Sequence, residues 1–73
     1  MGERNRRRIW LTKIRLEKEL TQTELAKQCG VSVQMISNIE LGRRQPSGPL
    51  AMKIARVLGF EMDKFYEDEH QTA

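Results

Sequence analysis

The sequence has little of what disulfides and metal sites need, because it holds one cysteine, Cys29, and one histidine, His70. A single cysteine cannot form a disulfide within the chain, which fits a reducing compartment. One cysteine and one distant histidine supply neither the ligand cluster of a metal site nor a cysteine nucleophile with its base. We therefore expect no metal and no other cofactor, and we predict that Cys29 is a small core residue.

Long apolar runs and catalytic motifs are missing as well. No apolar stretch approaches the ~18–20 residues that would cross a bilayer, and no signal-peptide pattern is present. The sequence contains no glycine-rich phosphate loop, and its acidic residues gather near the C-terminus instead of pairing in a plausible pocket. These absences predict a cytoplasmic protein that is not an enzyme and has no membrane partner.

The net charge of +3 is unevenly distributed over the 73 residues. Residues 1–60 hold twelve of the thirteen basic residues and five acidic ones, a net charge of +7. Residues 61–73 carry a net charge of −4. A basic body followed by an acidic segment indicates a polyanionic partner for the body, although the pattern alone is weak evidence, since ordinary solvated surfaces carry similar charge.

Apolar residues recur at spacings of three and four, and no stretch alternates with a period of two for long, so the sequence predicts one small all-α domain. Thr21 and Glu24 are spaced as a capping box, and Gly30 and Gly59 stand where helices would end. The predicted helices span residues 9–19, 22–29, 33–41, 50–58 and 62–67. We expect a basic N-terminal arm over residues 1–8, a helical domain over residues 9–67 and a flexible acidic and polar tail over residues 68–73.

The second and third predicted helices, joined at Gly30, form a helix-turn-helix candidate. Leu25 faces inward, and Ala26 is small where the two helices would cross. Ile36 and Ile39 lie three positions apart and are expected to pack back onto the second helix. A chance helical hairpin seldom places small, glycine and branched apolar residues at all of these positions.

The face of the third helix opposite these isoleucines is polar or short. It carries Gln34, Ser37, Asn38 and Leu41, with Val33 on one flank. Glutamine and asparagine can each make a paired contact to adenine in the major groove, serine can contact either edge, and Val33 could meet a thymine methyl group. Residues near the start of the second helix of such a motif reach the bases. A polar helix face is often only solvated, but together with the glycine turn and the caps we predict base contact, chiefly through Gln34 and Asn38.

Three segments occur in order along the chain: L-T-Q-x-E-L-A from Leu20, I-S-x-I-E-x-G from Ile36 and I-A-x-x-L-G from Ile54. In these segments the chain closely resembles the phage-repressor or Cro-like helix-turn-helix family, also called the XRE type, over about residues 9–66. The resemblance implies a compact, lambda-repressor-like bundle of about five helices with the helix-turn-helix at helices 2 and 3. It also implies sequence-specific binding of dimers to double-stranded DNA.

Four residues are predicted to contact DNA phosphates: Gln22, Arg43, Arg44 and Arg8. Gln22 begins the second helix, where its side chain and the helix N-terminus could both hold a phosphate, and the resemblance favours the same role. Arg43 and Arg44 follow the third helix in a loop suited to the flanking DNA backbone. Arg8 belongs to the arginine run 6–8, which could reach across a groove, although terminal arginines as often only aid solubility.

The resemblance further implies that Arg15 and Glu40 form a partly buried ion pair between helices 1 and 3. Removing one partner of such a pair would leave an uncompensated charge. We interpret both residues as structural, with the role of orienting the third helix.

The C-terminal part carries more aromatic area than a fraying tail needs, and Phe65 or Tyr66 is the predicted symmetric dimer contact. On the first helix, Ile9 and Leu16 form a second apolar face with Trp10 beside them. This face could pack under the C-terminal helix, which is the commoner outcome, or bind a partner. The fourth helix is expected to pack through Leu50, Met52, Ile54, Ala55 and Leu58.

Taken together, these features predict a homodimeric transcriptional regulator, more specifically a repressor of an inverted-repeat operator with half-sites about 10–10.5 base pairs apart. No small-molecule effector is expected. Control of a restriction–modification operon and an antitoxin role are alternatives on the same fold. A protein–protein adaptor that binds through Ile9, Trp10 and Leu16 is a further alternative. A non-specific nucleoid-type binder is disfavoured, because it would need a larger basic excess than +3.

Overall fold

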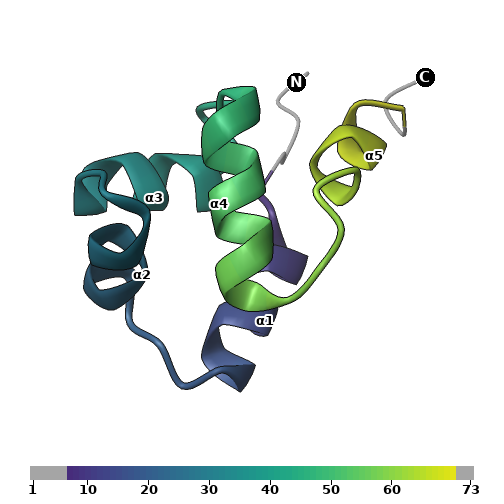
Figure 1. The fold of residues 1–73 in the computed structure, drawn as a ribbon. Coiled ribbons are helices and arrows are strands. Elements are labelled where there is room, and N and C mark those ends of the chain that lie inside the picture. The colour runs from purple at the N-terminus through teal and green to yellow at the C-terminus, as the bar shows by residue number, and fades with distance from the viewer. Residues whose placement is uncertain (1–6, 71–73) are drawn as a thin grey trace.

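Five helices make up most of residues 7–70, the range that the computed structural model describes (Figure 1). Helix α1 spans Ile9–Glu17, α2 spans Gln22–Cys29, α3 spans Val33–Glu40, α4 spans Gly48–Leu58 and α5 spans Lys64–His70. No strand occurs in this range, so the predicted all-α class is confirmed. In the view of Figure 1, α4 stands between the pair α2 and α3 on one side and α5 on the other.

Helices α2, α3 and α4 each begin at a side-chain cap. Thr21 Oγ1 accepts a hydrogen bond from the Glu24 amide at 3.0 Å, and Glu24 Oε1 accepts one from the Thr21 amide at 2.8 Å, so the predicted capping box is present. Ser32 and Ser47 each accept a bond from the amide three residues further on and cap α3 and α4. At its other end α2 stops at Gly30, whose φ of +72° lies in the left-handed region that glycine adopts without strain.

Helices α1, α3 and α4 differ from the predicted ranges at one end each, α3 by a single residue because it ends at Glu40. Helix α1 ends at Glu17, and Glu19 adopts a φ of +60°, so the chain turns before the predicted end of the helix. Helix α4 begins at Gly48, two residues earlier than predicted. The reason is the cap at Ser47, which allows Pro49 to lie in the first turn, where its missing amide would have no partner in any case.

Helix α5 lies closer to the C-terminus than predicted. It begins at Lys64 and extends to His70, so residues 68–70 are helical and do not belong to the expected tail. The predictions for Arg6 and for residues 71–73 lie outside the described residues.

The core receives side chains from all five helices. Its largest fully buried members are Phe65, Leu11, Leu25, Ile36, Ile39, Ile54, Leu58 and Cys29. Cys29 is therefore a core residue, as predicted, and burial raises the pKa of its thiol against the opposing charge of Lys53. In α4 the prediction was wrong for Met52, which is 47% exposed, whereas Ala51 is fully buried. Helical geometry explains this, because positions 50, 51, 54, 55 and 58 share one arc of the helix and Met52 lies outside it.

Three aromatic rings join α5 to the rest of the domain. Trp10 lies 5.2 Å from Phe60 and 5.4 Å from Phe65 between ring centroids, and Phe60 lies 5.6 Å from Phe65, all in edge geometry. The Lys64 ammonium lies 5.2 Å from the centroid of the Trp10 ring. Phe65 is fully buried in this cluster, so its predicted role as a dimer contact is wrong. Tyr66, its neighbour, is half-buried and stays a candidate.

No described part of the chain covers the apolar outer face of α1. Ile9 is 62% exposed and Leu16 is 59% exposed, so this face does not pack under the C-terminal helix as the commoner outcome would require. Trp10 alone of the three turns toward α5, through the aromatic cluster. None of the described helices is long and apolar enough to cross a membrane.

Candidate nucleic-acid interface

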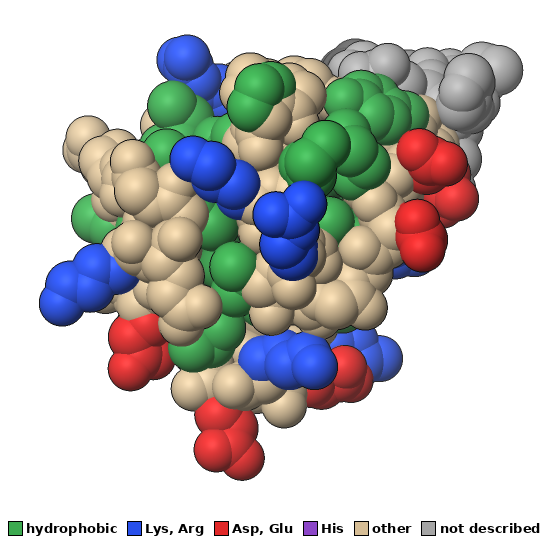
Figure 2. Space-filling view, in the orientation of Figure 1, with side chains coloured by type: hydrophobic (Ala, Val, Ile, Leu, Met, Phe, Trp, Pro, Cys, Tyr) green, Lys and Arg blue, Asp and Glu red, His purple; other side chains and the backbone are tan. Residues whose placement is uncertain are grey.

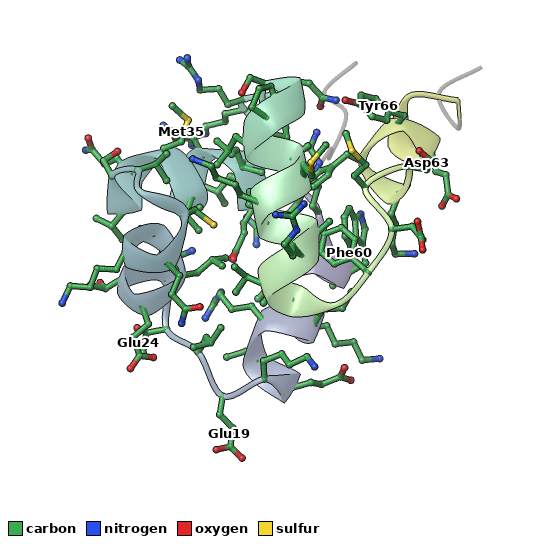
Figure 3. All side chains as sticks on the ribbon, in the orientation of Figure 1. Glu19, Glu24, Met35, Phe60, Asp63 and Tyr66 are labelled. Carbon is green, nitrogen blue, oxygen red and sulfur yellow. The ribbon has the colours of Figure 1, made fainter. Side chains whose placement is uncertain are left out.

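Helices α2 and α3 form a helix-turn-helix whose turn begins at Gly30 (Figure 3). Leu25 of α2 and Ile36 and Ile39 of α3 are almost completely buried, so these residues fix the rotation of α3 about its axis. Ala26 is also buried, as a small residue at the crossing of two helices should be. Since one face of α3 is committed to the core, the opposite face is turned outward.

The outward face of α3 carries the four residues for which we predicted base contact. Val33 is 42% exposed and Gln34 is exposed, and both lie in the first turn of the helix. Ser37 and Asn38, one turn further on, are half-buried. The two residues that are most accessible are therefore those at the N-terminal end of α3, the end that approaches the bases in proteins of this architecture.

The loop that follows α3 places two cations beside this face. Arg43 and Arg44 are both exposed. Their backbone amides donate to the Asn38 carbonyl at 2.9 Å and 3.3 Å, so the loop folds back onto the end of α3. Gly42, with a φ of +79°, allows this reversal. The acidic side chains that are visible in Figure 2 lie along the lower edge and on the side of α5.

Gln22, the third residue predicted to contact a phosphate, is bound within the protein by its side chain. Its Nε2 donates to Glu40 Oε1 at 3.0 Å, and the residue is half-buried in the first turn of α2. The sequence offered no indication of this bond, because the two residues are 18 positions apart. The phosphate contact stays a prediction, and the backbone amides of the first turn of α2 are the groups most suited to it.

Glu40, at the end of α3, is the centre of a buried polar network. Arg15 Nε lies 2.6 Å from Glu40 Oε2, and the two side chains are 9% and 4% exposed. Thr12 Oγ1 donates to Glu40 Oε1 at 2.8 Å, beside the bond from Gln22. Arg15 Nη1 donates in turn to the Leu20 carbonyl at 2.7 Å. The structure thus brings together the two residues that the family resemblance implies as a pair, and the network ties α3 to α1 and α2.

The ionisation of Glu40 links this network to pH. Burial alone would raise the pKa of Glu40, but the hydrogen bonds from Arg15, Gln22 and Thr12 and the charge of Arg15 outweigh it, and the pKa lies below its usual 4.5. A depressed pKa adds stability above the unfolded pKa, and this stability is lost as pH falls through the folded pKa. We expect the free energy of unfolding to decrease as the pH is lowered below about 4.5. In Glu40→Gln this decrease should be smaller, because the variant has no carboxylate at position 40.

Urea denaturation between about pH 6 and about pH 3 measures this effect. Glu17→Gln, which alters an exposed carboxylate of α1 instead, is the control and should keep the wild-type pH dependence. If the free energy of unfolding depends equally steeply on pH in the wild type and in Glu40→Gln, the prediction is wrong.

Arg8 is not part of an exposed arm. Its side chain is only 6% exposed, and Nη1 donates to the carbonyl of Ile39 at 2.7 Å. The predicted phosphate contact of Arg8 is therefore wrong, because the guanidinium is buried and donates its hydrogen bonds to groups of the protein. The sequence suggested an arm because Arg8 ends a run of arginines, and nothing local in that run distinguishes it from the exposed Arg7.

Comparison with known proteins assigns the family. The helix-turn-helix family model matches residues 11–65. The chain is 44% identical over 61 residues to YqaF, an uncharacterized HTH-type transcriptional regulator of Bacillus subtilis (strain 168), which covers 84% of this chain and 80% of that protein. It is 51% identical over 57 residues to an uncharacterized HTH-type transcriptional regulator of Methanothermobacter thermautotrophicus, over 75% of this chain and 83% of that protein.

A solved structure is similar as well. The restriction-modification controller protein C.AhdI from Aeromonas hydrophila superposes with a TM-score of 0.68 at 29% identity, over 75% of this chain and 83% of that chain. The chain belongs to the XRE-type helix-turn-helix family of DNA-binding transcriptional regulators.

Proposed function

We propose that the protein is a repressor that binds an inverted-repeat operator in double-stranded DNA as a homodimer, with α3 in the major groove. The observation that carries this proposal is the exposure of Val33 and Gln34 at the start of α3, on a helix that Ile36 and Ile39 fix to the core. Arg43 and Arg44 would contact the phosphates beside the groove. The protein would act in the cytoplasm, by binding and without catalysing a reaction.

A surface suited to a second copy lies between α4 and α5. Figure 2 shows hydrophobic side chains gathered over the upper ends of these helices, and Tyr66 lies at the same place in Figure 3. Met52, which the core does not use, is 47% exposed on α4. A two-fold axis at this surface would bring the same patch of each copy together, which is the usual symmetry of homodimers. The proposed dimer would therefore use Tyr66 and Met52 and would not use the buried Phe65.

Control of a restriction–modification operon is a second candidate. It is favoured by the superposition on C.AhdI, whose name describes it as such a controller. This candidate uses the same DNA-binding surface and differs in the gene that is regulated.

Selection from a random duplex library at about 150 mM salt tests the proposed function, since non-specific electrostatic binding is damped there. Enrichment of a palindrome would support a dimer that recognises sequence, and its spacing would define the operator. Absence of enrichment with folded protein would contradict the proposal. It would favour the adaptor alternative, for which Ile9 and Leu16 form the exposed surface.

Gln34→Ala is expected to weaken binding to the preferred duplex by about 1–3 kcal/mol and to relax discrimination at one base position. The reason is that Gln34 is exposed in the first turn of α3, where a side chain can reach a base edge. Binding to the operator and to its single-base variants measures both effects. Unchanged affinity and unchanged base preference would contradict the assignment.

Arg43→Ala is the matched control for this prediction. It removes an exposed cation of the loop and no residue of α3. It should weaken binding to all duplexes alike and lower the salt slope by about 1. A change in base preference would show that Arg43 contacts bases and not the DNA backbone.

A further inference from the structure

Arg8 is a buried cation that neither the proposed DNA contacts nor the Glu40 network explains. Besides its bond to Ile39, Nη1 donates to the Arg44 carbonyl at 3.1 Å, and Nη2 donates to Gln45 Oε1. The backbone amide of Arg8 donates to the Glu40 carbonyl at 2.7 Å. These four acceptors belong to the last two residues of α3 or to the loop that follows it. Arg8 therefore binds both the end of α3 and the loop that follows it.

The C-terminus of α3 needs such a partner. Its last turn contains no basic residue. The last four carbonyls of a helix accept no hydrogen bond from amides within the helix, and they give this end of the helix a partial negative charge. The Arg8 guanidinium donates to the Ile39 carbonyl, which also accepts from the Gly42 amide at 3.1 Å, and so it places a positive charge at this end; the Arg8 amide donates to the Glu40 carbonyl. A residue 31 positions earlier in the chain thus stabilises the end of α3.

The same contacts fix the backbone of the basic loop. Arg44 is bound on both sides, since its amide donates to the Asn38 carbonyl at 3.3 Å and its own carbonyl accepts from Arg8. The Arg43 amide shares the Asn38 carbonyl. The side chains of both loop arginines are nevertheless exposed. A loop whose backbone is fixed before binding loses less conformational entropy when its side chains contact phosphates.

We propose that Arg8 is a positioning residue for DNA binding, which holds the end of α3 and the Arg43–Arg44 loop in the geometry that contacts phosphates. The inference rests on the proposed function, because it assigns Arg8 a part in DNA binding. Arg8 does not touch DNA and acts through the loop. The planar guanidinium is essential to this role, since one lysine ammonium is a compact point charge and cannot reproduce the fork of donors.

The test is a double-mutant cycle between Arg8→Lys and Arg44→Ala, measured as the salt dependence of binding to the selected duplex. In the wild-type background, Arg44→Ala should lower the salt slope by about 1. In the Arg8→Lys background the same substitution should lower it by less than about 0.5, because the loop no longer presents Arg44 to a phosphate. Arg8→Lys alone should weaken operator binding about tenfold, a loss of about 1.4 kcal/mol.

Ile54→Val is the control for a general loss of stability. Ile54 is fully buried in α4, so the substitution disturbs the core but leaves every contact of Arg8 in place. Arg44→Ala should keep its full effect on the salt slope in this background. Circular dichroism establishes that each variant is folded at the assay temperature.

If Arg44→Ala still lowers the salt slope by about 1 in the Arg8→Lys background, the positioning role is overturned, whereas the proposed function in DNA binding stands. A wild-type protein that enriches no duplex would overturn the proposed function, and the role of Arg8 in DNA binding with it. Hydrogen exchange of the protein without DNA tests the contact of Arg8 with the loop independently of DNA binding. The Arg43 and Arg44 amides should exchange faster in Arg8→Lys and not in Ile54→Val, and unchanged exchange would overturn the loop contact itself.

Discussion

Replacing Glu40 by alanine is expected to lower the free energy of unfolding by about 3–5 kcal/mol. The loss is large because the Arg15 side chain is only 9% exposed and would keep its charge without the carboxylate that lies 2.6 Å away. Thr12 and Gln22 would lose their acceptor in the same step. A domain of 73 residues has a total stability of about 4–11 kcal/mol, so the loss would remove a large share of that stability.

Urea denaturation at neutral pH measures this loss, with the fluorescence of Trp10, the single tryptophan, as the signal. Glu17→Ala removes an exposed carboxylate from α1 and should change the stability by less than about 0.5 kcal/mol. A loss below about 1 kcal/mol for Glu40→Ala would show that solvent screens the pair despite its burial.

A double variant distinguishes the cause of the loss. If the uncompensated charge of Arg15 dominates, Arg15→Met combined with Glu40→Leu should recover most of the stability, because apolar residues of similar volume often replace a buried ion pair without a net loss. If the double variant is as unstable as Glu40→Ala, the hydrogen bonds to Thr12 and Gln22 carry the stability instead.

The helices that form the DNA-binding motif could be predicted from local sequence. The capping box at Thr21 and Glu24, the cap at Ser32 and the turn at Gly30 each depend on residues within a few positions of one another. The burial of Ile36 follows from helical periodicity once the ends of α3 are known. For this reason the outward face of α3 could be assigned from the sequence alone.

The role of Arg8 could not be predicted, because its acceptors are distant in sequence. The carbonyls of Ile39 and Arg44 lie 31 and 36 positions further along the chain, and they meet Arg8 only when α1 packs beside the end of α3. Locally, Arg8 is one member of a run of arginines, and such runs are usually exposed. The Glu40 bond of Gln22 escaped prediction for the same reason.

The position of the aromatic residues depended on where α5 begins. Two adjacent aromatic residues of a short helix cannot both point into the core of the domain. The choice between Phe65 and Tyr66 depends on contacts with Trp10, and Phe65 is the residue that makes them. Periodicity likewise showed that Ile9 and Leu16 share a face of α1, but it did not show that nothing in the described part of the chain covers that face. Local pattern gives the amphipathicity of a helix, and packing decides which face is used.

Phe65→Ala is expected to lower the free energy of unfolding by about 3–5 kcal/mol, as large-to-small aromatic substitutions in cores do. Phe65 is fully buried and contacts the rings of Trp10 and Phe60, and Arg8 lies 5.6 Å from its centroid. Helix α5 is only seven residues long, too short to be stable without packing, so it should separate from α1. Urea denaturation and the loss of helical circular dichroism below the main transition measure both effects.

Tyr66→Ala gives the matched comparison, because Tyr66 is adjacent in sequence but half-buried. It should leave the stability at low protein concentration nearly unchanged and raise the dimer Kd, which sedimentation equilibrium measures. Denaturation is followed at several protein concentrations, since dimerisation adds to apparent stability by mass action. If Phe65→Ala instead raised the dimer Kd without destabilising the monomer, Phe65 would be a dimer contact and not a core residue. If Tyr66→Ala leaves the dimer Kd unchanged, the surface between α4 and α5 is not the dimer interface.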